Sequence, residues 1–134
     1  MSSIHSSKSN DKCLFSQIIG LIPSTILSNC INKKSSDDGF RCYSTESQLI
    51  AMLFGQMNGC YSLRDITLSM KVNTLFLKEL GLQQSPARST MSDGNASRCY
   101  EVYELLFSEL LTYYKFLLSK MSIIRSLKRS KAVR

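Results

Sequence analysis

The chain has few of the residues that build zinc sites and membrane spans. Its 134 residues include one histidine, His5, and five cysteines with no C-x-x-C pair among them. Zinc sites draw on cysteines and histidines at characteristic spacings, so this pattern argues against a zinc site. No stretch reaches 18 consecutive apolar residues, which argues against a membrane-spanning helix. We therefore expect no metal, no other cofactor and no membrane partner.

The amino-terminal segment is polar and carries no apolar secretory signal. Proteins that stay in reducing compartments keep their cysteines as thiols. We therefore expect a cytoplasmic protein whose cysteines are reduced and mostly buried, with Cys60 the candidate for a reactive thiol.

Acidic residues are missing from the carboxyl end. Residues 1–109 hold ten Lys and Arg and all ten Asp and Glu, whereas residues 110–134 hold seven basic residues and no acid. Such a density attracts DNA or any other polyanion through counterion release, without reading its sequence. Lys128 and Arg129 are the candidates for such a contact, although a solvated basic end explains the pattern equally well.

Length and apolar content indicate one globular domain. The serine-rich residues 1–11 predict a disordered leader, residues 12–118 a helical domain and residues 119–134 a basic tail. Apolar residues recur at helical spacing, which predicts a compact all-α fold of five to seven helices. The strongest core helix is expected at 44–57, where Ser44 can cap and Leu53 and Phe54 lie on a broad apolar stripe.

A long helix is expected from Tyr100 onward, because apolar residues from Tyr103 to Ile124 alternate at spacings of four and three. Two alternatives stay open for this seam. Either it packs against the helix at 44–57 as far as about Leu111, or its outer part mediates self-association.

Two helix starts between Gly59 and Asn95 predict an elaborated helix-turn-helix. Ser62 and Asp65 fit a capping box that starts a helix at Leu63, and Ser89 can cap a second helix. Met70 and Arg88 lie 18 positions apart, which is too far for the simplest such unit. A further short helix is expected at 72–82, with Leu75, Phe76 and Leu80 inward and Gly81 at its end.

Basic and hydroxyl side chains on these helices are the candidate DNA contacts. They are Arg64, Arg88, Ser89, Thr90, Asn95 and Arg98. Hydroxyls at a helix start suit a phosphate, and amide or guanidinium groups suit adenine or guanine edges. In the alternative interpretation, Ser89 and Asp93 merely cap and Asn95 closes a short helix. The adjacent Asp37 and Asp38 lie in a polar loop, where acids usually face water, so no catalytic residue is assigned.

Several motifs together resemble the amino-terminal region of insertion-sequence DDE transposases of the IS-four type. GCYSLRDI at 59–66 and ARSTMSDGN at 87–95 resemble that family's SLRDI and RSTLADAN motifs. Four further segments occur in the family's order: FSQIIGLIP, FRCYSTESQLIAMLFGQ, ELG and YEVYELLFSELL. The resemblance therefore covers residues 13–118. Gly94 replaces an alanine of the pattern, which costs a helix roughly 1 kcal/mol.

The resemblance implies a domain that binds transposon-end DNA, alone, as a homodimer or together with full-length transposase. Transposases of this type cut DNA with two metal ions held by three carboxylates on a ribonuclease-H-like domain, which is expected only after residue 134. No acid follows Glu109. We therefore expect a truncated product that is not an enzyme. The alternative is a helical protein-interaction or oligomerisation module whose basic tail is incidental.

Overall fold

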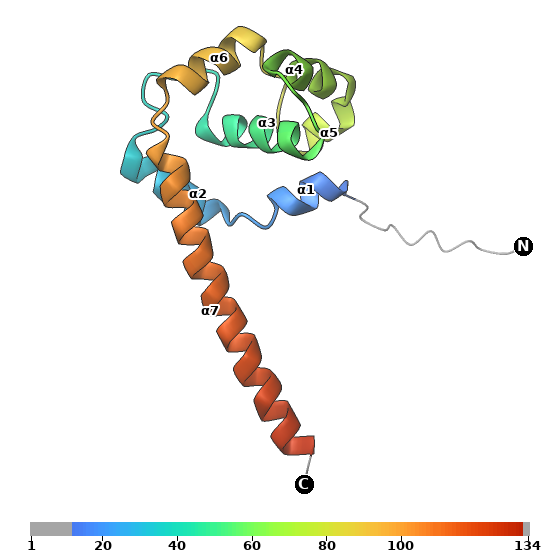
Figure 1. Ribbon diagram of the computed structural model, residues 1–134, viewed down its shortest axis with the longest axis vertical. Coiled ribbons are helices and arrows are strands. Elements are labelled where there is room, and N and C mark those ends of the chain that lie inside the picture. The colour runs from blue at the N-terminus through green and yellow to red at the C-terminus, as the bar shows by residue number, and fades with distance from the viewer. Residues whose placement is uncertain (1–11, 133–134) are drawn as a thin grey trace, which may run out of the picture.

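Helices make up all the regular structure between residues 12 and 132, the part of the chain that the computed structural model describes (Figure 1). The seven helices are α1 (Leu14–Ile19), α2 (Ser24–Lys34), α3 (Thr45–Met57), α4 (Leu63–Val72), α5 (Thr74–Glu79), α6 (Arg88–Ser97) and α7 (Glu101–Ala132). The predicted all-α fold is confirmed. The expected disordered leader, residues 1–11, lies outside the described residues.

Serine side chains fix the amino-terminal ends of α3 and α4. Ser44 Oγ accepts a hydrogen bond from the Ser47 N–H at 3.1 Å, and Ser62 Oγ accepts one from the Asp65 N–H at 3.1 Å. Each bond satisfies an N–H group that the first turn of a helix leaves without a backbone partner. The helix starts predicted at these two serines are confirmed.

Helix α3 supplies the centre of the main core. Ile50 and Phe54 are buried, and the Phe54 ring lies 5.8 Å from the Phe15 ring of α1 and 5.0 Å from the Phe76 ring of α5, centroid to centroid. The predicted stripe is therefore the core-facing side of this helix. Leu53, at its edge, is only partly buried against the core.

Helix α5 is shorter than the predicted helix at 72–82; Phe76 and Leu80 pack against the core as expected, but Leu75 does not. Leu75, expected to point inward, is 77% exposed, whereas Leu77 is 6% exposed. A helix of less than two turns is oriented by its connections, and this one begins directly after Asn73 at the end of α4. Gly81 adopts φ +71°, as predicted for the residue that ends the segment.

Helix α4 packs against α3 on one side and α6 on the other. A side chain at Gly55 of α3 would place its Cβ 2.5 Å from Ile66 Cδ1, so glycine is what allows α4 to approach this closely. On the other side, Met91 of α6 is fully buried, and its sulfur lies 3.7 Å from the Thr67 hydroxyl oxygen of α4. The three helices thus form one packed unit.

The first turns of α7 pack mainly against α2 and not, as one alternative had it, against α3. Val102 and Leu106 of α7 form a second core cluster with Leu27 and Cys30 of α2, while α3 adds only the partly buried Leu49. Phe107, a member of the predicted seam, is 66% exposed.

The cysteines were expected to be mostly buried, and this expectation is wrong. Of the five cysteines, only Cys30 is buried.

Helix α7 continues without interruption as far as Ala132, through the described part of the segment expected to be a separate basic tail, and it projects away from the other helices (Figure 1). Every side chain from Leu118 to Ala132 is exposed. None of the helices between residues 12 and 132 is long and apolar enough to cross a membrane.

Candidate nucleic-acid interface

Helix α6 begins two positions earlier than a cap at Ser89 predicts. Ala87, directly after Pro86, has extended backbone angles and is the residue at the helix boundary, so no side chain caps α6. Ser89 lies inside the first turn and does not cap, which corrects the sequence-based assignment. The N–H groups at the start of α6 therefore remain without a side-chain partner, and the helix dipole makes this end partly positive.

Hydrogen bonds hold the segment before α6 against α4. The Thr67 hydroxyl, which has one proton to share, lies 3.0 Å from the Leu63 carbonyl oxygen and 3.2 Å from that of Pro86, and the Ser85 hydroxyl donates to the Thr67 carbonyl oxygen at 3.0 Å. Thr67 is buried. These bonds fix the start of α6 relative to the exposed face of α4.

An open groove of about 320 Å³ lies between α4 and the start of α6, and we call it the basic groove. It is lined by Arg64, Thr67, Leu68, Lys71, Ala87 and Arg88. The three cations among these residues are exposed, and the lining contains no carboxylate. Positive charge without a neutralising acid in the same groove favours an anionic partner.

Arg98 is not at this surface. Its side chain is 1% exposed, and its Nη1 donates to Asp37 Oδ1 at 3.1 Å and to Thr45 Oγ1 at 2.9 Å. Nη2 donates to the Tyr43 carbonyl oxygen, and the guanidinium carbon lies 4.1 Å from the centre of the Phe40 ring. The prediction that Arg98 contacts DNA is therefore wrong, because its side chain is buried and both of its Nη groups donate to interior acceptors.

The remaining candidates are divided between the groove region and α7. Ser89 and Asn95 are exposed on α6, although Asn95 Oδ1 accepts a hydrogen bond from Gln48 Nε2 of α3 at 2.6 Å. Lys128 and Arg129 lie at the far end of α7, where they are exposed but apart from α4 and α6 (Figure 1). The structure thus brings Arg64 and Arg88 together and leaves the α7 cations elsewhere.

Sequence reasoning missed Lys71, which completes the basic groove. Arg64 and Lys71 are seven positions apart, and two turns of a helix return to nearly the same face. Because the helix at α4 had already been predicted from its capping serine, this spacing could have identified Lys71 as a neighbour of Arg64.

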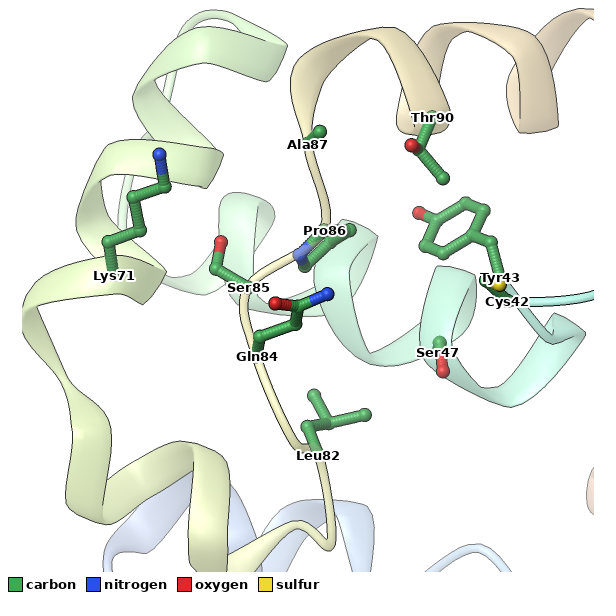
Figure 2. Close-up of a pocket in the computed structure, with 10 residues that line it drawn as sticks. All are labelled: Cys42, Tyr43, Ser47, Lys71, Leu82, Gln84, Ser85, Pro86, Ala87 and Thr90. Atoms are coloured by element: carbon green, nitrogen blue, oxygen red, sulfur yellow. The ribbon is translucent and has the colours of Figure 1, made fainter.

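A second, neighbouring pocket of about 330 Å³ contains Tyr43, also missed, and we call it the Tyr43 pocket (Figure 2). Tyr43 precedes α3 and is 3% exposed. A Cβ at Gly94 of α6 would lie 2.8 Å from two carbons of the Tyr43 ring, so glycine lets the ring pack against α6. This contact accounts for glycine where the transposase pattern has alanine.

Residues 10–83 match the family model of DUF4372, a domain of unknown function. The matched residues make up more than half of the chain. The chain belongs to the DUF4372 family. No curated protein and no solved structure matches it.

The part of this DUF4372 chain that matches the family model contains α1 to α5 and ends before α6. Arg64 and Lys71 therefore lie within the matched region, and Arg88 lies beyond it. Among residues 12–132, no three His, Cys, Asp or Glu side chains gather closely enough to hold a metal ion.

Proposed function

We propose that this DUF4372 chain binds duplex DNA in the basic groove, as the domain that recognises transposon ends for an insertion-sequence transposase. The observation that supports the proposal best is the lining of the groove, with Arg64, Lys71 and Arg88 and no carboxylate. Lysine and arginine that neutralise DNA phosphates release condensed counterions, and this release supplies much of the binding free energy. The choice of transposon-end DNA as the bound duplex rests on the resemblance to IS-four-type transposases.

The geometry supports separate roles for the exposed side chains. We assign the three groove cations and the hydroxyls of the first α6 turn to backbone phosphates, because such contacts position a protein on DNA. Asn95, two turns further along α6, can present its amide to a base edge once its bond to Gln48 is exchanged. Arg98 is assigned no contact with DNA.

Fluorescence anisotropy with a labelled duplex tests the proposal. The duplex carries the terminal repeat of a neighbouring insertion element and is compared with a scrambled duplex at two salt concentrations. Lys71→Ala should weaken binding and lower the log–log salt slope by about 0.9, because the variant neutralises one phosphate fewer. Lys78→Ala is the matched control, because Lys78 is exposed on α5 and does not line the groove. Equal affinity for both duplexes, with the two lysine variants indistinguishable, would overturn the proposal.

Two further variants separate reading of sequence from simple attraction. Asn95→Ala should lower affinity for the terminal repeat more than for the scrambled duplex, because a base-specific contact provides about 1–3 kcal/mol of discrimination. Replacing Lys128 and Arg129 together by alanine should weaken both duplexes about equally. If the α7 double variant changes the ratio between duplexes and Asn95→Ala does not, the roles assigned to α6 and α7 are wrong.

The proposed function is binding without cleavage. DNA cutting by transposases of this type needs three carboxylates that hold two metal ions. Purified protein with Mg²⁺ or Mn²⁺ should therefore neither nick nor join a terminal-repeat duplex. Metal-dependent nicking that disappears in Asp65→Asn or Asp93→Asn would contradict this proposal.

The outer part of α7 favours a second candidate function, self-association. Met121 and Ile124 continue the predicted seam at a spacing of three and are 54% and 53% exposed, and other apolar side chains of this segment are exposed around the helix: Phe116, Leu118, Ile123 and Leu127. An exposed apolar stripe on a helix is the feature that coiled-coil partners cover. Sedimentation equilibrium decides this candidate: a dimer that Ile124→Glu converts to a monomer supports it, and a monomer at all concentrations rejects it.

A further inference from the structure

The Tyr43 pocket lies where the start of α3, the segment 82–87 and the start of α6 meet (Figure 2). Its lining contains hydroxyl, amide and ammonium groups but no carboxylate. The pocket adjoins the basic groove, because Lys71 and Ala87 line both. An anion that enters the groove therefore has a polar pocket of about 330 Å³ beside it.

Tyr43 has a buried hydroxyl group with no hydrogen-bond partner within the described residues. Figure 2 shows the ring beneath Thr90 with the hydroxyl turned toward Pro86 and Ala87. Burial raises the pKa of Tyr43 to about 12, partly offset by the positive charge of Arg98. The hydroxyl therefore keeps its proton at neutral pH and remains a hydrogen-bond donor. A buried donor without an acceptor is costly, so this group calls for a ligand that supplies one.

The start of α6 borders this pocket, because Ala87 and Thr90 line it. Helix α6 has ten residues, and no side chain caps its first turn. The N–H groups of Arg88, Ser89 and Thr90 have no carbonyl oxygen within the helix to bond to, because an α-helix leaves these first groups free. Their dipoles favour negative charge at this end. The Thr90 side chain lines the pocket next to Tyr43.

Lys71 provides the full positive charge. It lies on α4, across the pocket from Tyr43 and Thr90 (Figure 2). In Figure 2 the Lys71 ammonium group points along α4, and the segment 84–86 runs between it and Tyr43, so the long lysine side chain would have to turn toward the pocket to reach an anion there. Phosphate, with several acceptor oxygens around one centre, could then bond to donors on both sides.

We infer that the Tyr43 pocket binds one phosphate group, held by the Tyr43 hydroxyl, the first-turn N–H groups of α6 and Lys71. The inference rests on the proposed function for its source of phosphate, a backbone phosphate of the bound duplex. Free inorganic phosphate carries the same chemistry and is the other source. The two sources are separated by experiment.

Inorganic phosphate is titrated into the ¹⁵N-labelled full chain at constant ionic strength, with chloride as the reference anion. Saturable shifts are expected at the N–H signals of residues 88–90. Tyr43→Phe keeps the ring and removes the hydroxyl, and it should weaken phosphate binding by about tenfold, the effect of one hydrogen bond to a charged group. Tyr61→Phe, at a position that is 99% exposed, is the matched control and should bind as the wild type does.

The same variants are then measured with duplex DNA. Tyr43→Phe should lower affinity for the terminal-repeat and scrambled duplexes alike and leave the salt slope unchanged, because the hydroxyl carries no charge and Lys71 still neutralises the phosphate. Phosphate-induced shifts without any DNA binding would leave the phosphate site standing and remove the proposed function. DNA binding that is unchanged in Tyr43→Phe, together with no saturable phosphate shifts in the wild type, would overturn the inference and leave the proposed function intact.

Discussion

Arg98→Met is the substitution that most directly tests how this fold is held together. Methionine keeps much of the length and apolar contact of the arginine but removes all three of its hydrogen bonds to Asp37, Thr45 and Tyr43. These bonds attach the loop before α3 to the junction of α6 and α7. Their removal should loosen the packing between segments more than 50 positions apart in sequence.

The expected magnitude follows from what remains in place. Breaking a fully buried ion pair by removing one partner costs about 3–5 kcal/mol. The Asp37 side chain is 35% exposed and still accepts a hydrogen bond from the Thr45 N–H at 2.6 Å, so water and backbone compensate part of the loss. We therefore expect Arg98→Met to lower the free energy of unfolding by about 2–4 kcal/mol. That is a large fraction of the stability of a domain of this size.

Urea denaturation followed by circular dichroism at 222 nm measures this change. Arg88→Ala is the matched control, since Arg88 is exposed and its loss should alter stability by no more than about 0.5 kcal/mol. A double-mutant cycle with Asp37→Asn should give a coupling energy of about 1–3 kcal/mol between the two side chains. An Arg98→Met variant that unfolds like the wild type but loses DNA affinity would refute the interior assignment and restore Arg98 to the DNA surface.

Three further predictions concern stability. Phe54→Ala should destabilise by about 3–5 kcal/mol because it removes a buried ring from the aromatic cluster, and an unchanged melting temperature would show that the core is elsewhere. Ser62→Ala should cost about 1 kcal/mol of unfolding free energy through loss of the α4 cap, whereas Ser89→Ala should cost less than about 0.5 kcal/mol, and the reverse order in urea denaturation would mean that Ser89 caps after all. Gly94→Ala should destabilise despite the roughly 1 kcal/mol gain in helix propensity, because its Cβ would lie 2.8 Å from the Tyr43 ring; a rise in melting temperature would contradict the packing described.

Local signals in the sequence predicted the helices well. The serines at 44 and 62 act on N–H groups three residues away, so their effect can be inferred without the tertiary fold. The stripe on α3 was likewise correct, because a long amphipathic helix has only one face to bury. The cap of α6 was misassigned by two positions, from Ala87 to Ser89, since the extended residue after Pro86 is Ala87.

Long-range contacts explain what the sequence could not show. Arg98 is buried because Asp37, Thr45 and Phe40 surround it, and nothing in the spacing of these residues announces that they meet. The face of α5 and the choice of α2 as the packing partner of α7 also depend on how the helices are placed relative to one another. The basic groove joins Arg64 and Lys71, which share a helix face, to Arg88 on another helix.

The length of α7 limits how the two basic regions can work together. A helix of 32 residues at about 1.5 Å per residue extends about 48 Å, and Lys128 lies about 40 Å along it from Glu101. One turn of duplex DNA spans about 34–36 Å. The cations at the end of α7 and those of the groove therefore cannot neutralise the same phosphates. A duplex that contacts both basic regions would have to span more than one turn of DNA between them. The length of α7 would then set the length of DNA that the protein protects.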